Sequence, residues 1–328
     1  MAAIGGVRSF NMTEAGTMFK DVPDDLLAGI LSAETTIVYG APGVGKGRVM
    51  AEIIVSGLNG ESFAGCMWSQ KLTSVEIITT DSGGAREYDK YLRRAGLRPT
   101  QEPAVTFHSV EDPGRVDWRE LAASIAYRSP SPVIVDNSTE AVRGSVNDSE
   151  NVQRFTDALA PLYARMPAIP LVLVHHVAKP SAETGGRRGQ TPIGSGLWEA
   201  FSRNKVLVRD GFRAEAADVT LELRPRFSPA WELRLNNADN GRLTVAAVIT
   251  SADKASAKRK RSDATKVRNV EVAKWVVANG DGTNVSATSK LVAKEFGLNP
   301  NSTRAALQQA RDYGALLQRT DGRWQLMA

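Results

Sequence analysis

The sequence predicts a mixed α/β fold, in which a doubly wound, mostly parallel sheet carries an antiparallel hairpin extension and a small winged-helix domain follows it. Three observations support this prediction. Short β-branched runs alternate with helical patterns through the first two hundred residues. Hairpin-type strands replace that alternation from Lys205 onward, and basic residues concentrate in the last quarter of the chain.

Five apolar runs are expected to form the parallel strands, because strands covered on both faces need continuous apolar sequence. Helical patterns such as Arg48 to Leu58 and Ala85 to Gly96 separate them. Four further runs between 205 and 249 alternate with turn residues and predict the antiparallel extension. The five parallel runs are TTIVYG (35–40), VEIITTD (75–81), AVTFHS (104–109), PVIVDN (132–137) and PLVLVHH (170–176).

The C-terminal quarter predicts a second domain. Residues 251–266, SADKASAKRKRSDATK, lack apolar periodicity and predict a flexible basic linker between a core at 1–250 and a domain at 267–328. Three helical patterns and a hairpin with an Asp321-Gly322 turn then fit within about sixty residues. That order is typical of a winged helix-turn-helix that binds DNA.

Charge and composition narrow the partners and the compartment. From Ser251 onward the chain has 14 basic and 7 acidic residues, against 27 and 29 before it. A basic quarter indicates a polyanion partner, although a merely soluble basic surface is the open alternative. One cysteine, Cys66, and no apolar run of about 18 residues indicate a cytoplasmic protein outside the membrane.

The sharpest motif is GAPGVGKG, which follows the strand TTIVYG and opens a helical pattern. Glycines there aim backbone N–H groups at phosphates and a lysine neutralises β- and γ-phosphate oxygens, so the motif predicts an ATP-binding P-loop. A chance glycine-rich turn is the alternative. Gly47 replaces the Ser or Thr whose hydroxyl normally coordinates magnesium. The expected ATP-binding residues are Gly40, Ala41, Pro42, Gly43, Val44, Gly45, Lys46, Gly47 and Arg48.

Asp136 ends the strand run PVIVDN, where a carboxylate can bind Mg²⁺ directly or through water. Asp136 is therefore the candidate metal ligand. An aspartate that merely caps a strand-to-loop turn is the alternative.

Taken in order, YGAPGVGKG, LNGESFAG, VEIITTDSGGAREYDKYLRRAG, VIVDN, LVLVHHVAK and GSGLWEAF resemble the RecA-like hexameric helicases of the plasmid RepA type over about 24–249. The resemblance implies a RecA-like core that assembles as a ring, binds ATP between subunits and moves along single-stranded DNA. In that family Glu-Asp ends the second strand, and its Glu polarises the attacking water. Here Thr80-Asp81 stands instead, so either Asp81 is the base or the water goes unactivated.

The resemblance also implies roles for later residues. His176 matches a position that senses the γ-phosphate, and residues 179–194 lie where such rings keep a DNA-binding loop, with Arg187 and Arg188 as phosphate contacts. Arg226 is the candidate arginine finger of a neighbouring subunit and Arg224 its companion. A satisfied strand-end histidine, a solvated loop and solvated hairpin arginines are the alternatives.

In the winged-helix region, the exposed face of the third helical pattern is expected to enter the major groove of duplex DNA, with neighbouring cations on phosphates. A protein-interaction role is the alternative. The predicted DNA-binding residues are Lys290, Asn301, Thr303, Arg304, Gln308, Arg311 and Arg323.

The leading hypothesis is an ATP-driven helicase or translocase of replication or recombination, working as a homo-oligomeric ring or filament on DNA. Lys46, Asp81, Asp136, His176 and Arg226 would be its catalytic residues. A nucleotide-gated DNA-binding protein with weak or no hydrolysis, such as an initiator, loader or recombination mediator, is the second hypothesis, which Gly47 and Thr80 favour. A transcription regulator with an ATPase sensor is the third.

Overall fold

The computed structural model describes residues 3–4, 7–8, 10–165, 167–177, 191–210, 218–279, 285–297, 299, 301, 303–304, 307–308, 316–318 and 324–326. By its internal contacts the chain divides into two compact units, Met1–Ser251 and Ala252–Ala328.

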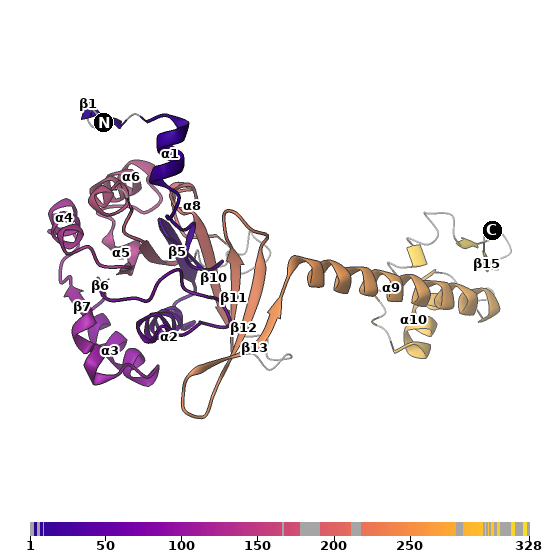
Figure 1. The fold of residues 1–328 in the computed structure, drawn as a ribbon. Coiled ribbons are helices and arrows are strands. Elements are labelled where there is room, and N and C mark those ends of the chain that lie inside the picture. Colours follow the sequence, from indigo (N-terminus) through magenta and orange to yellow (C-terminus); the bar gives the residue numbers. More distant parts are fainter. Residues whose placement is uncertain are drawn as a thin grey trace. The chain divides into compact units, whose positions relative to one another are not determined.

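Nine of the described strands form one sheet in the first unit, in the order β13-β12-β11-β10-β5-β9-β8-β6-β7 (Figure 1). The six strands from β10 to β7 are parallel, and β11, β12 and β13 continue the sheet as antiparallel neighbours. The predicted mostly parallel α/β sheet is confirmed. Its strands are β5 (Thr35–Gly40), β6 (Val75–Thr79), β7 (Val105–Ser109), β8 (Val133–Asp136), β9 (Leu171–His176), β10 (Asn204–Asp210), β11 (Val219–Arg224), β12 (Trp231–Asn237) and β13 (Leu243–Ile249).

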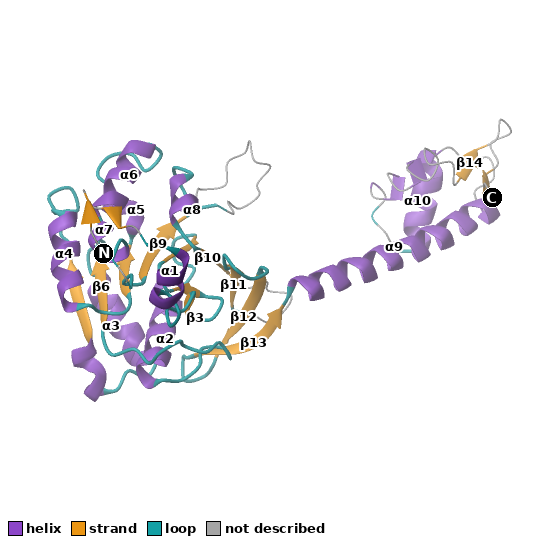
Figure 2. Ribbon diagram, turned by 45° about the horizontal axis from the view of Figure 1, so that its top comes forward, coloured by secondary structure: helices purple, strands orange, loops and turns teal. Residues whose placement is uncertain are grey.

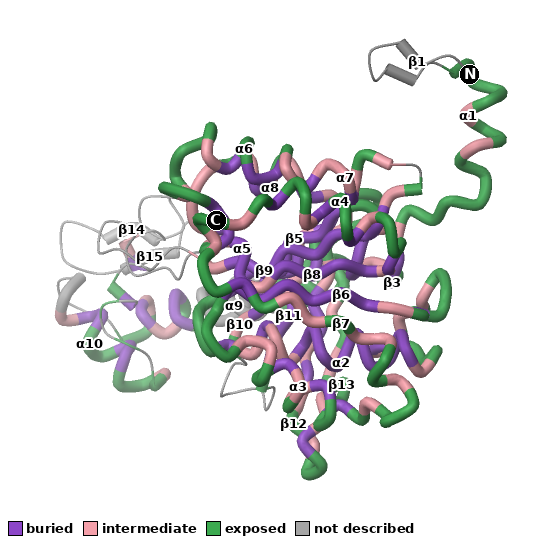
Figure 3. Tube along the Cα trace, turned by 90° about the vertical axis from the view of Figure 1, so that its left-hand side faces the viewer, coloured by how far each residue is buried: buried purple, intermediate pink, exposed green. Residues whose placement is uncertain are grey.

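Helices cover both faces of this sheet (Figure 2). One apolar cluster joins the sheet to α2 (Lys46–Asn59) and α3 (Gly84–Arg94). The other joins it to α4 (Trp118–Arg128), α6 (Ser149–Ala158), α7 (Ala160–Tyr163) and α8 (Leu197–Phe201). The central strands are accordingly buried along most of their length (Figure 3), as a doubly covered sheet requires.

The strand register brings one edge of the sheet together. Gly40, the last residue of β5, pairs with His176 of β9 and Val208 of β10. Thr79, the last residue of β6, pairs with Asp136 at the end of β8. The carboxyl ends of β5, β6, β8 and β9 therefore meet at one edge, which is where α/β sheets place their ligands.

Shorter elements complete the first unit. Near the N-terminus, α1 (Met12–Met18) begins with a capping box between Asn11 and Glu14. The remaining short elements are β1 (Ala3–Ile4), β2 (Val7–Arg8), β3 (Asp25–Leu27), β4 (Leu31–Ser32), the 3₁₀ turn η1 (Pro99–Ala104) and α5 (Ser138–Ala141). None of the described helices combines the length and hydropathy that a membrane span needs.

The second unit corrects one expectation. Residues 251–266, predicted as a flexible linker, are the first part of α9 (Ser251–Asn279), a continuous helix. The segment has no Gly or Pro and is rich in Ala, Lys and Arg, which favour helix without any packing. Residues 251–260 are all exposed, so the missing apolar periodicity reports their exposure and not a lack of helix.

Beyond α9 the structure describes α10 (Val285–Glu295) and the antiparallel pair β14 (Leu316–Gln318) and β15 (Trp324–Leu326). Val276, Val292 and Leu307 form the buried centre of an apolar cluster. Leu291 is 43% exposed because the buried face of α10 passes through Val292. These elements do not by themselves confirm a winged helix, which stays a prediction.

Candidate functional site

The loop between β5 and α2 requires glycines for two reasons, namely the backbone conformation at some positions and close packing at another. Gly43 and Gly45 have φ values of +75° and +94°, which L side chains rarely adopt. A Cβ on Gly40 would lie 2.4 Å from the carbonyl oxygen of Val208, so only glycine fits beside β10. Val44 is buried and anchors the loop, while Ala41 and Pro42 are exposed. Because no side chain caps α2, the N–H groups of its first turn remain available to an anion.

Lys46 is the first residue of α2 and is buried. Its Nζ donates to the carbonyl oxygens of Gly40 and Ala41, both at 3.1 Å, and lies 3.3 Å from Nδ1 of His176. Burial lowers the pKa of Lys46, while the charges of Asp136 and Asp81 oppose that shift. The ammonium group is thus held at the loop by weak neutral acceptors, within electrostatic reach of two carboxylates.

Asp136 lies at the end of β8, and its peptide bond to Asn137 is cis. The phenol of Tyr88, on α3, donates to Asp136 Oδ2 at 2.8 Å. Burial raises the pKa of Asp136 to about 6, against the opposing effects of Tyr88 and Lys46. Tyr88 was not among the predicted site residues, because its position on the buried face of an amphipathic helix predicts only a packing role.

A carboxyl pair lies beside this group. Asp81 follows the end of β6, and its side chain neighbours Glu140 of α5. Burial has the largest effect on the pKa of Glu140 and Asp81 the next largest, and together they raise it to about 7. Sequence reasoning found Asp81 but missed Glu140, whose only signal was its position four residues after Asp136.

Thr80 stands where the resemblance expects a glutamate, and it has a structural task. Its Oγ1 donates to the carbonyl oxygen of Asn137 and accepts from the N–H of Asn137, both at 3.0 Å. Its own N–H donates to the carbonyl oxygen of Asp136 at 2.9 Å. These three bonds tie the backbone after β6 to the backbone after β8.

Residues 12–182 match the family described as AAA domain, and this match spans more than half of the chain. The chain belongs to the AAA domain family. Membership makes it a nucleotide-binding P-loop ATPase, for which the loop at Gly40 to Gly47 supplies the expected structure. A search of the curated proteins gives no match to the chain.

The two histidines of this AAA domain have different surroundings. His176 is half-buried beside Lys46, and its backbone N–H donates to Thr139 Oγ1 at 3.2 Å. His175 is fully buried, with Nδ1 3.0 Å from Ser138 Oγ and Nε2 donating to the carbonyl oxygen of Ile193 at 2.8 Å. Burial lowers the pKa of His175 to about 4, so it is neutral near pH 7. The predicted sensor His176 therefore lies at the site, and His175 joins α5 to Ile193.

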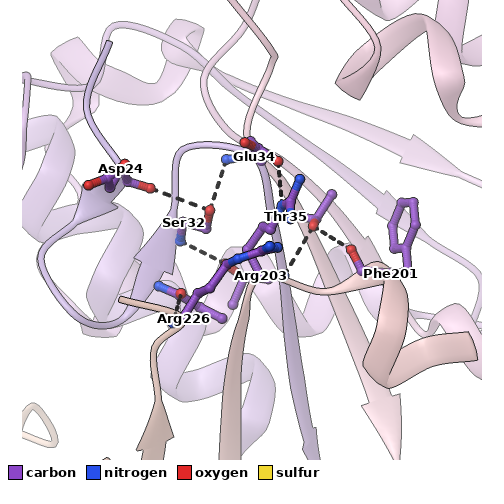
Figure 4. A network of polar contacts seen from close by, with 9 residues as sticks. Asp24, Ser32, Glu34, Thr35, Phe201, Arg203 and Arg226 are labelled. Carbon is purple, nitrogen blue, oxygen red and sulfur yellow. Dashed lines mark hydrogen bonds and ion pairs between the residues drawn. The ribbon is translucent and has the colours of Figure 1, made fainter. Parts of the chain in front are cut away.

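Arg224 and Arg226 lie away from the P-loop of the same AAA domain. Arg224 pairs in register with Lys205 near the start of β10, and the N–H of Arg226 donates to Asn204 Oδ1 at 3.1 Å. Figure 4 shows Arg226 beside Thr35 and Arg203, at the amino end of β5. Asn204 pairs with Thr36, four residues from Gly40 along β5. At about 3.3 Å per residue, roughly 13 Å of strand separates the two ends, so the backbone of Arg226 lies far from the nucleotide site of its own chain.

The side chain of Arg48, predicted to bind ATP, contacts the hairpin extension instead. Its guanidinium donates to Asn237 Oδ1 and, at 2.6 Å, to the carbonyl oxygen of Gly241. These partners belong to the β12–β13 turn. The side chain of Arg48 therefore fastens α2 to the hairpin extension and is not the part of this residue that could contact a nucleotide.

The predicted DNA contacts fall into three groups. Lys290, Asn301 and Arg304 are exposed, and Gln308 is half-buried. Thr303 is buried, and its Oγ1 donates to the carbonyl oxygen of Asn299 at 3.0 Å, so its placement on the exposed face was wrong. A residue two positions after a helix start faces back toward the capping turn, which explains this burial. Arg187, Arg188, Arg311 and Arg323 lie outside the described residues.

The described residues of the site could hold magnesium through the carboxylate of Asp136. Among the described residues no three His, Cys, Asp or Glu side chains gather as a metal cage. Mg²⁺ commonly takes one or two carboxylates together with substrate phosphates, and Asp136 offers such a carboxylate beside the P-loop. Asp136 would therefore hold the ion jointly with the nucleotide.

Proposed function

We propose that the chain is an ATP-hydrolysing motor of the RepA type, which assembles as a ring, uses Mg²⁺ and acts on DNA. The observation that supports this best is the convergence of Lys46, Asp136 and the Asp81–Glu140 pair at one sheet edge. Phosphoryl transfer to water requires a cation for the phosphates, a metal ligand and a group that handles the proton of water. These residues supply one of each.

ATP is the substrate. Lys46 exchanges the carbonyl oxygens of Gly40 and Ala41 for β- and γ-phosphate oxygens, because charged acceptors bind an ammonium group more strongly than neutral ones. Deprotonated Glu140, beside Asp81, accepts a proton as water attacks the γ-phosphorus. The bond from that phosphorus to the β–γ bridging oxygen breaks, which releases ADP and phosphate. Magnesium would neutralise charge on the phosphate oxygens, and Asp136 is the residue that would hold it.

A ring completes the site through a neighbouring subunit. Arg226 lies at the sheet edge opposite the P-loop, so it can reach a nucleotide only in another copy of the chain. An arginine supplied in this way stabilises the charge that develops on the transferred phosphoryl group. The position of Arg226 supports its role as the finger in trans.

Two features support DNA as the partner. Val177 pairs with Pro192, and the N–H of Ile193 donates to the carbonyl oxygen of His176, so the described residues on either side of positions 178–190 lie beside His176. Arg187 and Arg188 belong to this segment, which is the candidate contact for single-stranded DNA. The exposed Lys290, Asn301 and Arg304 are the candidate contacts for duplex DNA in a winged helix.

The test is steady-state ATP hydrolysis of the full chain with magnesium, with and without single-stranded DNA, alongside an ATP-binding titration. We expect DNA to stimulate turnover, and Lys46→Ala to abolish binding and turnover together. Arg165→Ala is the matched control, because Arg165 bonds to Ala126 and Ser129 on the far side of α4. Turnover that survives Lys46→Ala would overturn the proposal.

A nucleotide-gated DNA-binding protein is the second candidate, and Thr80 favours it. The hydroxyl of Thr80 is hydrogen bonded to the backbone of Asn137, and Thr80 has no carboxylate that could accept a proton from water. Tight ATP binding by the wild type without turnover, together with DNA affinity that changes with ATP, would select this function over the motor.

A further inference from the structure

Gly47 lies next to Asp136, the candidate ligand of magnesium. Residue 47 is the P-loop position that normally carries a Ser or Thr hydroxyl for magnesium. A Cβ built on Gly47 would lie 3.7 Å from Asp136 Oδ2, from Tyr88 Cζ and from Tyr91 Cε2. The side chain that this position lacks would thus have pointed at Asp136 and at two tyrosine rings.

Another helix brings a hydroxyl group to Asp136. Tyr88 on α3 is 3% exposed and belongs to the apolar cluster under the sheet. Its phenol donates to Asp136 Oδ2 at 2.8 Å, the same oxygen that a Cβ at position 47 would approach. Burial and the charge of Asp136 raise the pKa of Tyr88 well above its usual value, so the phenol keeps its proton and stays a donor.

We propose that Tyr88 compensates from α3 for the hydroxyl that the P-loop lacks at Gly47, acting not as a metal ligand but as a positioning residue that orients Asp136 for magnesium. This inference rests on the proposed function, because it assumes that Asp136 holds the ion. Carboxylates that bind metals depend on hydrogen bonds from a surrounding shell, and loss of such a bond commonly costs about 10–100-fold in metal affinity. A rigid ring packed in the core is well suited to hold that bond.

Tyr91 provides a matched control within α3. Its ring also faces Gly47, but its phenol donates to Glu87 Oε1 at 2.5 Å, on the exposed side of the helix. Tyr91→Phe and Tyr88→Phe each remove one phenol oxygen from the same helix. Only Tyr88→Phe removes a bond to Asp136.

The experiment measures how tightly the full chain binds a fluorescent, non-hydrolysable ATP analogue as the magnesium concentration is varied. We expect Tyr88→Phe to keep the affinity measured in EDTA, which also reports a folded P-loop, and to need about tenfold more magnesium for half of the metal effect. Tyr91→Phe should match the wild type.

A second variant tests the exchange of hydroxyls directly. Contacts of 3.7 Å are ordinary van der Waals distances, so Gly47→Ser should fit. In the Tyr88→Phe background, Gly47→Ser should restore the magnesium requirement toward that of the wild type. A Tyr88→Phe chain with the same magnesium response as Tyr91→Phe would overturn the inference and leave the proposed function intact, whereas a wild type that binds no nucleotide would overturn both.

Discussion

The side chains of Asp81 and Glu140 are neighbours at one edge of the sheet, although they follow two different strands. Two neighbouring carboxyl groups repel each other when both are ionised, so one of them keeps its proton more readily. The pKa of Glu140, about 7, makes it the group that holds this proton near neutrality. The pair is therefore suited to exchange a proton with water at the pH at which the protein works.

Replacing Glu140 should separate binding from hydrolysis. We expect Glu140→Gln to lower the rate of ATP turnover by about 10²–10⁴-fold, the usual contribution of a general base, with little change in ATP affinity. Glu150→Gln is the control, because Glu150 forms an exposed ion pair with Arg154. Steady-state rates and ATP-binding titrations of the two variants provide the measurement. Equal turnover rates for Glu140→Gln and Glu150→Gln would show that Glu140 has no part in the mechanism.

The rate should depend on pH with a defined sign. Glu140 accepts a proton only when deprotonated, so turnover should rise with pH and reach half of its maximum near the pKa of about 7. Asp81 contributes to that raised pKa, so Asp81→Asn should move the midpoint to lower pH. A pH–rate profile of each chain provides the measurement. A profile of Asp81→Asn that coincides with the wild type would contradict the coupling.

His175 should make the fold sensitive to acid. Its pKa is about 4 in the folded chain and about 6.5 when unfolded, so the unfolded chain binds the proton more readily and stability falls as the pH drops from about 6.5 toward 4. From about pH 7 to about pH 5 this difference costs about 2 kcal/mol. Urea unfolding at both pH values should show a smaller loss for His175→Gln, and an equal loss would mean that His175 carries no such penalty.

Arg226 should act between subunits. Arg226→Ala is expected to reduce turnover by about 10³-fold while ATP still binds, which is typical of a lost arginine finger. Mixing Arg226→Ala chains with Lys46→Ala chains should recover activity, because some interfaces then combine an intact P-loop with an intact arginine. Arg203→Ala, which breaks the nearby ion pair with Glu34, is the control. No recovery on mixing would argue against action in trans.

Two neighbouring residues should separate DNA contact from folding in the C-terminal unit. Arg304→Ala, at an exposed position, should weaken duplex DNA binding by about tenfold without changing the melting temperature. Thr303→Ala should lower the melting temperature and leave DNA affinity unchanged, since its hydroxyl bonds to Asn299. Fluorescence anisotropy and calorimetry provide the two measurements. A reversed pattern would reject the proposed recognition face.

Much of the first unit could be predicted because its signals are local. Thr35–Gly40 forms β5 as predicted, and the other apolar runs differ from their strands by one or two residues at the ends. Glycines and a lysine in a fixed spacing likewise predict a P-loop without tertiary information. By contrast, β7 is only partly buried, because an edge strand of similar composition has a neighbour on one side only.

The site residues that the sequence analysis missed depend on contacts between distant segments. Tyr88 and Glu140 become functional candidates only because α3 and α5 bring them to Asp136 and Asp81. Arg48 looked like a nucleotide ligand by position, yet a hairpin almost two hundred residues later occupies its guanidinium. The first part of α9, residues 251–266, was predicted to be a linker because a helix without an apolar stripe has the sequence pattern of a linker.

The bonds of Thr80 to Asn137 and Asp136 have a mechanical consequence. They lock the two backbone segments that carry Asp81 and Asp136, so these carboxylates cannot drift apart unless the bonds break. In the proposed ring, each chain would therefore keep these two carboxylates at a constant separation. The order of hydrolysis events would then depend on the contact between chains, where Arg226 of one chain meets the nucleotide of the next.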